Sequence, residues 1–184
     1  MTLAVGATHG HDAMVPVRRF AAIELKWPGQ ISQNMANTYT SLFYHFVFST
    51  KHRRPVIRVD IEKRVWAYIG GVARAHGLTA IEVGGIEDHV HGLMLAKPIH
   101  APCDIAKWLK ADSSKWIHEE FPELKNFSWQ DGYGAFSVSR SKAPDVVDYI
   151  KRQREHHMKE PFEDEYRRLM ELHEVEYDIK YLLD

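Results

Sequence analysis

The fold of this chain is decided by the stretch Glu87-Asp88-His89-Val90-His91-Gly92-Leu93-Met94-Leu95. A continuous apolar run follows two histidines that are one residue apart, which is typical of a buried β-strand. Alternate side chains of a strand share a face, so His89 and His91 point to one side and Val90 to the other. Two imidazoles on one face of a strand can bind one metal ion together.

The histidine content limits what this pair establishes by itself. With 12 histidines in 184 residues, roughly one His-x-His pair is expected by chance. The chain has a second pair, His9-Gly10-His11, in a stretch with no strand pattern. Two polar residues near the start of a strand are the ordinary interpretation of such a pair. The assignment of a metal site therefore depends on residues elsewhere in the chain.

The patterns on both sides of the histidine strand indicate a split βαβ fold. Turn residues and alternation predict strands over residues 39–50, 78–83, 89–97 and 133–139. Helical spacing predicts helices over 61–76, which Asp60 can cap, and over 104–120, 144–159 and from 162 onward. This order predicts an α+β, ferredoxin-like split βαβ antiparallel sheet with helices on one face, plus C-terminal helices. The first and third strands are then central, so the histidines lie in mid-sheet.

The chain divides by composition into three parts. Residues 1–34 show no sustained periodicity, and we expect a poorly ordered N-terminal extension there, with Met35 as an alternative start. Residues 35–159 contain 18 Lys and Arg against 14 Asp and Glu, whereas residues 160–184 contain 3 against 9. We therefore expect a mildly basic domain over 35–160 and an acidic helical tail over 161–184. This asymmetry permits phosphate binding without requiring it.

Bulk properties restrict the class of protein. The 45% hydrophobic and 27% charged fractions are those of a globular protein. No apolar run approaches the ~20 residues of a membrane span, and the N-terminus lacks the layout of a secretion signal. The single cysteine, Cys103, excludes an internal disulfide and fits the reducing cytoplasm. We expect a cytoplasmic protein with no membrane partner.

Basic side chains gather where three of the predicted elements end or turn. Lys51-His52-Arg53-Arg54-Pro55 follows the first strand, and such a group could clamp phosphates or form a solvated loop. The second helix and the loop before the 144–159 helix present further cations. The candidate phosphate-binding residues are Lys51, Arg53, Arg54, Lys107, Lys110, Arg140 and Lys142.

Three segments together resemble a known family. Tyr44-His45-Phe46-Val47-Phe48-Ser49-Thr50-Lys51, Asp88-His89-Val90-His91 and Tyr149-Ile150-Lys151-Arg152-Gln153 resemble the single-tyrosine transposases of the IS 200/605 insertion-sequence group. These are HUH endonucleases, named for His-hydrophobic-His. The resemblance covers about residues 35–160, and the tail from Phe162 through Tyr181-Leu182 resembles many members. It identifies 35–160 as an HUH transposase catalytic domain.

The resemblance implies a role for each motif residue. Tyr149 is the nucleophile that cleaves single-stranded DNA and keeps a 5′-phosphotyrosine, with a free 3′-hydroxyl on the other fragment. His89, His91 and Gln153 bind a divalent metal, Mg²⁺ or Mn²⁺. The spacing agrees, because Tyr149 and Gln153 are four residues apart and share one helix face. A phenol with a pKa near 10 also needs such help at neutral pH.

The resemblance also implies the partners. It predicts a transposase that cleaves and rejoins single-stranded DNA at hairpin-bearing insertion-sequence ends. It predicts a homodimer in which the tyrosine of one subunit completes the histidine site of the other. The residues alone leave three alternatives open: a domesticated nuclease that processes repeated palindromes, a ferredoxin-like nucleic-acid-binding module without chemistry, and a metal-dependent phosphoesterase that forms no covalent intermediate.

Overall fold

The structure is a computed structural model that describes residues 38–178. The described residues form one compact unit, which includes residues 38–160 of the predicted catalytic domain and the tail as far as residue 178. The expected N-terminal extension, the pair His9-Gly10-His11 and Tyr181-Leu182 lie outside the described residues. No helix within residues 38–178 is both long enough and apolar enough to cross a membrane.

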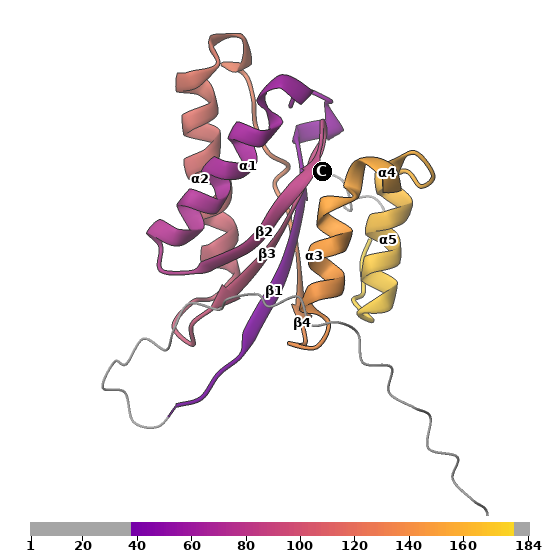
Figure 1. The fold of residues 1–184 in the computed structure, drawn as a ribbon. Helices are drawn as coiled ribbons and strands as arrows, with labels where there is room; N and C mark the ends of the chain where they lie inside the picture. Colours follow the sequence, from indigo (N-terminus) through magenta and orange to yellow (C-terminus); the bar gives the residue numbers. More distant parts are fainter. Residues whose placement is uncertain (1–37, 179–184) are drawn as a thin grey trace, which may run out of the picture. The chain divides into compact units, whose positions relative to one another are not determined.

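A four-stranded antiparallel sheet forms the centre of the molecule, with strand order β2-β3-β1-β4 (Figure 1). The first and third strands are central, which confirms the predicted ferredoxin-like arrangement. The strands are β1 Leu42–Ser49, β2 Thr79–Ile86, β3 His89–Ala96 and β4 Gly134–Val138. β2 and β3 form the predicted hairpin, although β2 extends three residues beyond the expected end.

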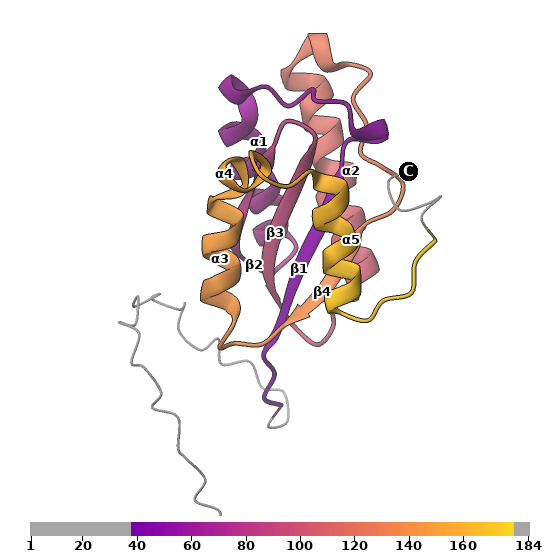
Figure 2. The ribbon, with the colours of Figure 1, turned by 90° about the vertical axis from the view of Figure 1, so that its right-hand side faces the viewer.

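Helices cover both faces of this sheet (Figures 1 and 2). The two helices that connect the strands, α1 Val59–Ala75 and α2 Pro102–Glu120, pack on one face as predicted. The opposite face is covered by the C-terminal helices, α3 Ala143–Lys151, α4 Gln153–His157 and α5 Phe162–Leu172. Short 3-10 turns follow β1 and α2, at Lys51–Arg53 and Pro122–Leu124.

Two apolar clusters hold these layers together. Alternation along β1 sends Phe46 and Phe48 into the cluster shared with α1 and α2, and it sends Val47 to the other face. The smaller cluster lies beneath the tail helix and comprises Val47, Phe136, Phe162, Tyr166, Leu169 and Met170. β1 is therefore buried on both faces, as its continuous apolar pattern predicts.

Two local details differ from the sequence prediction. α1 begins one residue before Asp60, so Asp60 does not cap it; its carboxylate lies in the first turn and pairs with Arg58 at 3.1 Å. The helix predicted over 144–159 is interrupted at Arg152, which divides it into α3 and α4. The Arg152 N–H donates to both Asp148 and Tyr149 carbonyls, each at 3.2 Å, and the chain turns there instead of continuing straight.

Candidate active site

His89 and His91 lie at the start of β3, between β1 and β2, with side chains 0% exposed. Both point to the sheet face that the C-terminal helices cover, whereas Val90 belongs to the cluster on the other face. Their ring centroids are 5.1 Å apart. Hydrogen bonds to strands on both sides fix the backbone here, so the two imidazoles share a rigid support.

Asp88 orients the first imidazole. Its Oδ1 lies 2.7 Å from His89 Nδ1, and its Oδ2 accepts from Arg53 at 3.1 Å. Burial opposes the ionised form of Asp88, but the hydrogen bond from His89 and the nearby Arg53 outweigh it and lower the pKa of this carboxyl. An ionised Asp88 accepts the Nδ1–H of His89, which leaves the lone pair on Nε2 directed into the cluster.

His45, on β1, is the corresponding partner of His91. His45 Nε2 lies 2.9 Å from His91 Nδ1, and both rings are buried. Burial lowers the pKa of His45 well below its usual range and lowers that of His91 to about 4, so both are neutral at pH 7. When His91 Nδ1 donates this hydrogen bond, its Nε2 lone pair faces the same cluster as that of His89.

Tyr149 projects from α3 toward the histidine pair. Its ring centroid lies 5.8 Å from that of His91, in an edge-on arrangement. The phenol donates a short hydrogen bond to Glu165, and Arg168 Nη2 lies 3.5 Å from the same oxygen. Burial and the negative charge of Glu165 raise the pKa of Tyr149, so the phenol is protonated at neutral pH in this arrangement.

Gln153 reaches the cluster from the start of α4. Its Oε1 lies 3.1 Å from His89 Nε2 and 2.9 Å from His157 Nε2, and its Nε2 donates to Glu165 at 3.1 Å. Tyr149 and Gln153 point to the same side, as predicted, despite the turn at Arg152, because both side chains contact Glu165. The structure thus brings together the four residues that the motifs indicate.

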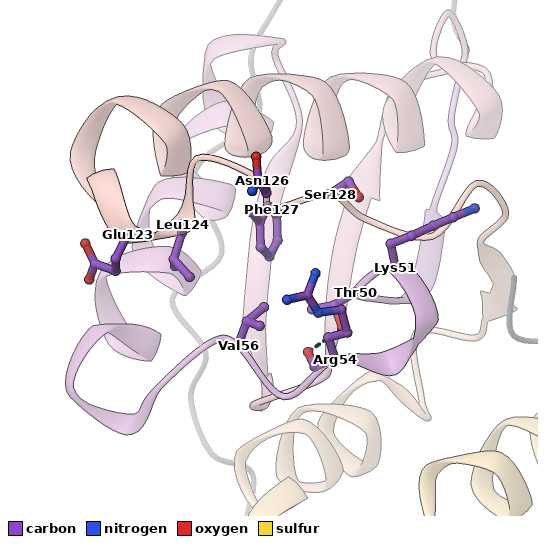
Figure 3. Close-up of a pocket in the computed structure, with 9 residues that line it drawn as sticks. All are labelled: Thr50, Lys51, Arg54, Val56, Glu123, Leu124, Asn126, Phe127 and Ser128. Carbon is purple, nitrogen blue, oxygen red and sulfur yellow. Dashed lines mark hydrogen bonds between the residues drawn. The ribbon is translucent and has the colours of Figure 1, made fainter.

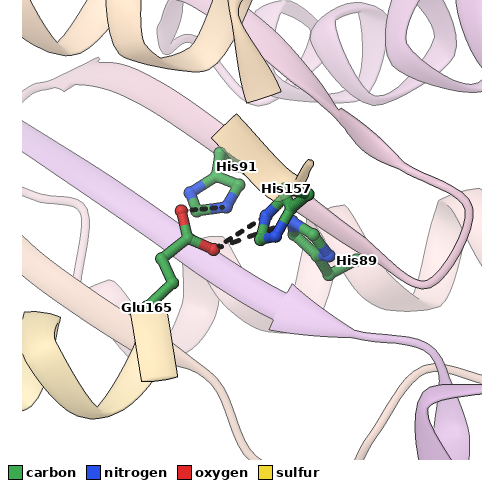
Figure 4. Close-up of side chains that lie close together, drawn as sticks. All are labelled: His89, His91, His157 and Glu165. Atoms are coloured by element: carbon green, nitrogen blue, oxygen red, sulfur yellow. Dashed lines mark ion pairs between the residues drawn. The ribbon is translucent and has the colours of Figure 1, made fainter. Parts of the chain in front are cut away.

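Five further residues at the site were not assigned a role from the sequence: His45, Asp88, His157, Glu165 and Arg168. Figure 4 shows the Glu165 carboxylate between His91 and His157. His157 lies four residues after Gln153, so helical spacing could have indicated it. Glu165 falls within the apolar stripe of the tail helix, three residues after Phe162 and four before Leu169. A charged residue in such a stripe is a detectable signal.

The cluster has the properties of a cation site. His89, His91, His157 and Glu165 each place one possible ligand atom within 4.8 Å of the others. Two buried atoms there lack an ordinary hydrogen bond among the described residues: His91 Nε2, and Glu165 Oε2, whose near contact is the ion pair with His157 Nε2 at 3.1 Å. Buried polar atoms without partners are rare, and here both are electron donors directed at one point. The residues therefore fit a divalent metal ion.

A pocket of about 510 Å³ opens beside the tyrosine. It lies between β4, α3 and α5, and its polar lining includes Ser139, Lys142 and Arg168. His45 and Tyr149 form part of its wall. A nucleotide that enters here meets the phenol with cationic side chains nearby, which suits a phosphodiester.

The candidate phosphate-binding residues fall into separate places. Lys51 and Lys110 both bond Asp131, one to its carboxylate at 2.8 Å and the other to its carbonyl at 2.8 Å. Lys107 and Lys110 line one pocket of about 480 Å³ with this turn. Arg140 and Lys142 precede α3, on the side of Tyr149. Arg53 is engaged by Asp88, with its guanidinium 5.5 Å from the Phe162 ring centroid.

A smaller pocket of about 110 Å³ lies at the end of β1 (Figure 3). The Arg54 side chain points into it, toward Phe127, whereas Lys51 points away. Arg54 has no ion-pair partner in the part of the chain that the structure describes. A cation beside an aromatic ring and the hydroxyl group of Ser128 is suited to a sugar–phosphate segment.

The fold and this site define a class of protein in which a histidine pair on a central strand and a helical tyrosine meet in one buried cluster. The family described as "Transposase IS200 like" matches residues 38–153, more than half of the chain. The chain belongs to this family of IS200-like transposases, which confirms the family predicted from the three motifs.

Relatives of known name agree with this membership. The ISDra2 transposase TnpA of Deinococcus radiodurans is 28% identical over 61% of this chain and 84% of its own length. The transposase for insertion sequence element IS200 of Salmonella typhimurium is 27% identical over 67% of this chain and 84% of its own. A crystal structure of a Deinococcus radiodurans protein, assigned as a transposase, superposes with a TM-score of 0.55. That protein is 26% identical, over 66% of this chain and 98% of its own.

Proposed function

We propose that this protein cleaves and rejoins single-stranded DNA at insertion-sequence ends through a covalent 5′-phosphotyrosine at Tyr149. One observation supports this most directly. The Tyr149 hydroxyl lies in the same buried cluster as His89 and His91, and the Tyr149 side chain also lines a pocket of about 510 Å³. The likeness to named transposases supports the same reaction class.

The proposed reaction is a transfer of a phosphoryl group to the phenol. A bond forms between the Tyr149 oxygen and phosphorus while the bond from phosphorus to the 3′ oxygen breaks, and that oxygen takes up a proton from water and leaves as a 3′-hydroxyl. Glu165 is the acceptor in contact with the phenolic proton, and Arg168 is the cation nearest the attacking oxygen. The phosphotyrosine conserves bond energy, so a 3′-hydroxyl can reverse the step without ATP.

We infer that His89, His91 and Gln153 hold a divalent metal ion, Mg²⁺ or Mn²⁺, beside the tyrosine. Such an ion polarises the phosphate oxygens and offsets the charge that builds up in the transition state. The hydrogen bonds of Asp88 and His45 hold the two imidazoles with a lone pair facing inward. These contacts support a metal role for the pair over a purely structural one.

The proposed partner is single-stranded DNA that carries hairpin ends, bound in the cytoplasm by a homodimer. The Arg54 pocket and the Lys51, Lys107 and Lys110 region support binding of a sugar–phosphate backbone. Arg140 and Lys142 lie just before the N-terminus of α3, the helix that bears Tyr149. They would contact the DNA strand near the cleaved phosphate.

An adduct assay tests this function. Single-stranded DNA from the flanking ends of the gene is incubated with protein and Mn²⁺ and analysed on a denaturing gel. We expect a covalent adduct with wild-type protein and with Tyr68→Phe, whose hydroxyl makes no hydrogen bond among the described residues. Tyr149→Phe removes one oxygen and little volume, so this variant should bind DNA but form no covalent adduct. A fully paired duplex should not react. Adduct formation by Tyr149→Phe would refute the nucleophile.

A further inference from the structure

The tail helix α5 places a carboxylate at the centre of the histidine cluster. Glu165 is 0% exposed, although its neighbours Phe162, Tyr166 and Leu169 form the apolar stripe of the same helix. Burial of a carboxylate is costly unless it is paired or coordinates a metal. Packing of the tail therefore does not explain why this position is acidic.

The separations of the side-chain atoms match those of ligands around one ion. Glu165 Oε2 lies 3.1 Å from His157 Nε2 and 3.9 Å from His89 Nε2, and Glu165 Oε1 lies 3.5 Å from His91 Nε2. Ligand atoms that are each about 2.0–2.2 Å from a common ion lie roughly 3–4 Å from one another. The four side chains thus surround a point where an ion can sit with only small adjustments.

The backbone and Asp88 orient the two outer imidazoles for this purpose. His157 Nδ1 lies 2.8 Å from the Glu160 carbonyl, and His89 Nδ1 lies 2.7 Å from Asp88. Each Nδ1–H is used in that bond, so the Nε2 of each ring faces the cluster. Metal-binding histidines characteristically donate their second N–H in this way. The Phe162 ring stacks on His89, with centroids 4.1 Å apart, and restricts its rotation.

From this geometry we propose that His157 and Glu165 complete a four-ligand metal site with His89 and His91, so that metal binding and docking of α5 are coupled. The proposal rests on the proposed function only for the presence of a metal at the histidine pair. Three imidazoles and one carboxylate favour Mn²⁺, Co²⁺ or Zn²⁺ over Mg²⁺. Gln153, a ligand in the proposed function, lies outside this set of four and supports the site by donating its Nε2–H to Glu165 at 3.1 Å.

Metal binding and docking of α5 are coupled because one of the four ligands, Glu165, lies on α5. An ion that binds only when Glu165 is in place stabilises the docked position of α5 by its own binding free energy. The ion should therefore protect the backbone amides of α5 against hydrogen exchange, although α5 is a separate element from β3, the strand that bears the histidine pair.

Titration with Co²⁺ in the absence of DNA tests the ligand set. The full chain is freed of metal with a chelator, and the Kd and the visible spectrum of bound Co²⁺ are recorded. We expect Glu165→Gln and His157→Gln to raise the Kd at least about tenfold and to change the spectrum. Glu171→Gln, an exposed position on the same helix, should behave as wild type. Glu165→Asp keeps the charge but shortens the reach, so it separates loss of the ligand from loss of the fold.

Hydrogen exchange provides the second readout. Co²⁺ should slow exchange in α5 of the wild type and of Glu171→Gln, and should leave α5 of Glu165→Gln unchanged. Wild-type affinity in both Glu165→Gln and His157→Gln, with loss of binding in His89→Ala, would overturn this inference while leaving the metal role of the pair intact. Unchanged binding in His89→Ala and His91→Ala would instead remove the metal from the proposed function.

Discussion

At the scale of single residues, His45 contacts His91, and we expect it to act as a positioning residue whose effect reaches the proposed metal through that imidazole. We expect His45→Phe to weaken metal affinity and DNA cleavage by about 10- to 100-fold, because His91 Nδ1 loses its only side-chain partner among the described residues. His45→Gln can place a polar atom near the position of the lost nitrogen, so it should retain most of both. Metal titration and the adduct assay measure the two effects. Equal loss in both variants would indicate that His45 serves packing alone.

The residues of the candidate site differ in how far the sequence could indicate them. His89, His91, Tyr149 and Gln153 were predicted because local spacing and known motifs identify them. His157 and Glu165 were missed because their role depends on the turn at Arg152 and on the docking of a separate helix. Only tertiary structure shows that these positions converge.

At the scale of elements, Gly84 on β2 sets how closely α3 approaches the sheet. A Cβ at Gly84 would lie 2.9 Å from the Ile150 side chain and 3.0 Å from its carbonyl oxygen. Gly84→Ala should push α3 outward and displace Tyr149, which precedes Ile150. We expect cleavage to fall by about 10- to 100-fold, since small misplacements of reacting groups are costly. Overpacking should lower the free energy of unfolding by about 1–3 kcal/mol.

The matched control for this change is Gly71→Ala on α1. There the nearest atom would be the end of the Arg74 side chain at 3.9 Å, so an added methyl has room. Alanine in a helix interior is also more favourable than glycine by about 1 kcal/mol. This variant should be at least as stable as wild type, with normal cleavage. Normal cleavage by Gly84→Ala would show that α3 tolerates the shift.

The elements were the most predictable level of the fold. The strand order followed from alternating and helical patterns, and β1 was recognised as central by its apolar residues on both faces. The break between α3 and α4 could not be predicted from the sequence, because residues Tyr149 to His157 contain no proline or glycine that would indicate a turn. The turn is visible only in the backbone, where the Arg152 N–H is shared between the Asp148 and Tyr149 carbonyls.

At the scale of the whole molecule, one chain contains a complete set of site residues. The resemblance to the family predicts that Tyr149 acts on the histidine pair of a partner, but here its ring lies beside His91 of the same chain. We therefore expect a mixture of His89→Ala and Tyr149→Phe proteins to form no adduct, even after subunit exchange verified with a fluorescent label. Recovery of cleavage in the mixture would mean that α3 is exchanged between two subunits.

The location of α5 also has a genetic consequence. The family match ends at residue 153, and α5 begins at Phe162, yet this helix covers Val47 and Phe136 on the sheet and supplies Glu165. A stop codon or frameshift between these positions leaves every family motif intact in the gene. Its product would expose the part of the sheet around Val47 and Phe136 that α5 covers, and we expect cellular proteases to remove it. Surveys that count intact gene copies by these motifs alone would then include copies whose protein product is inactive.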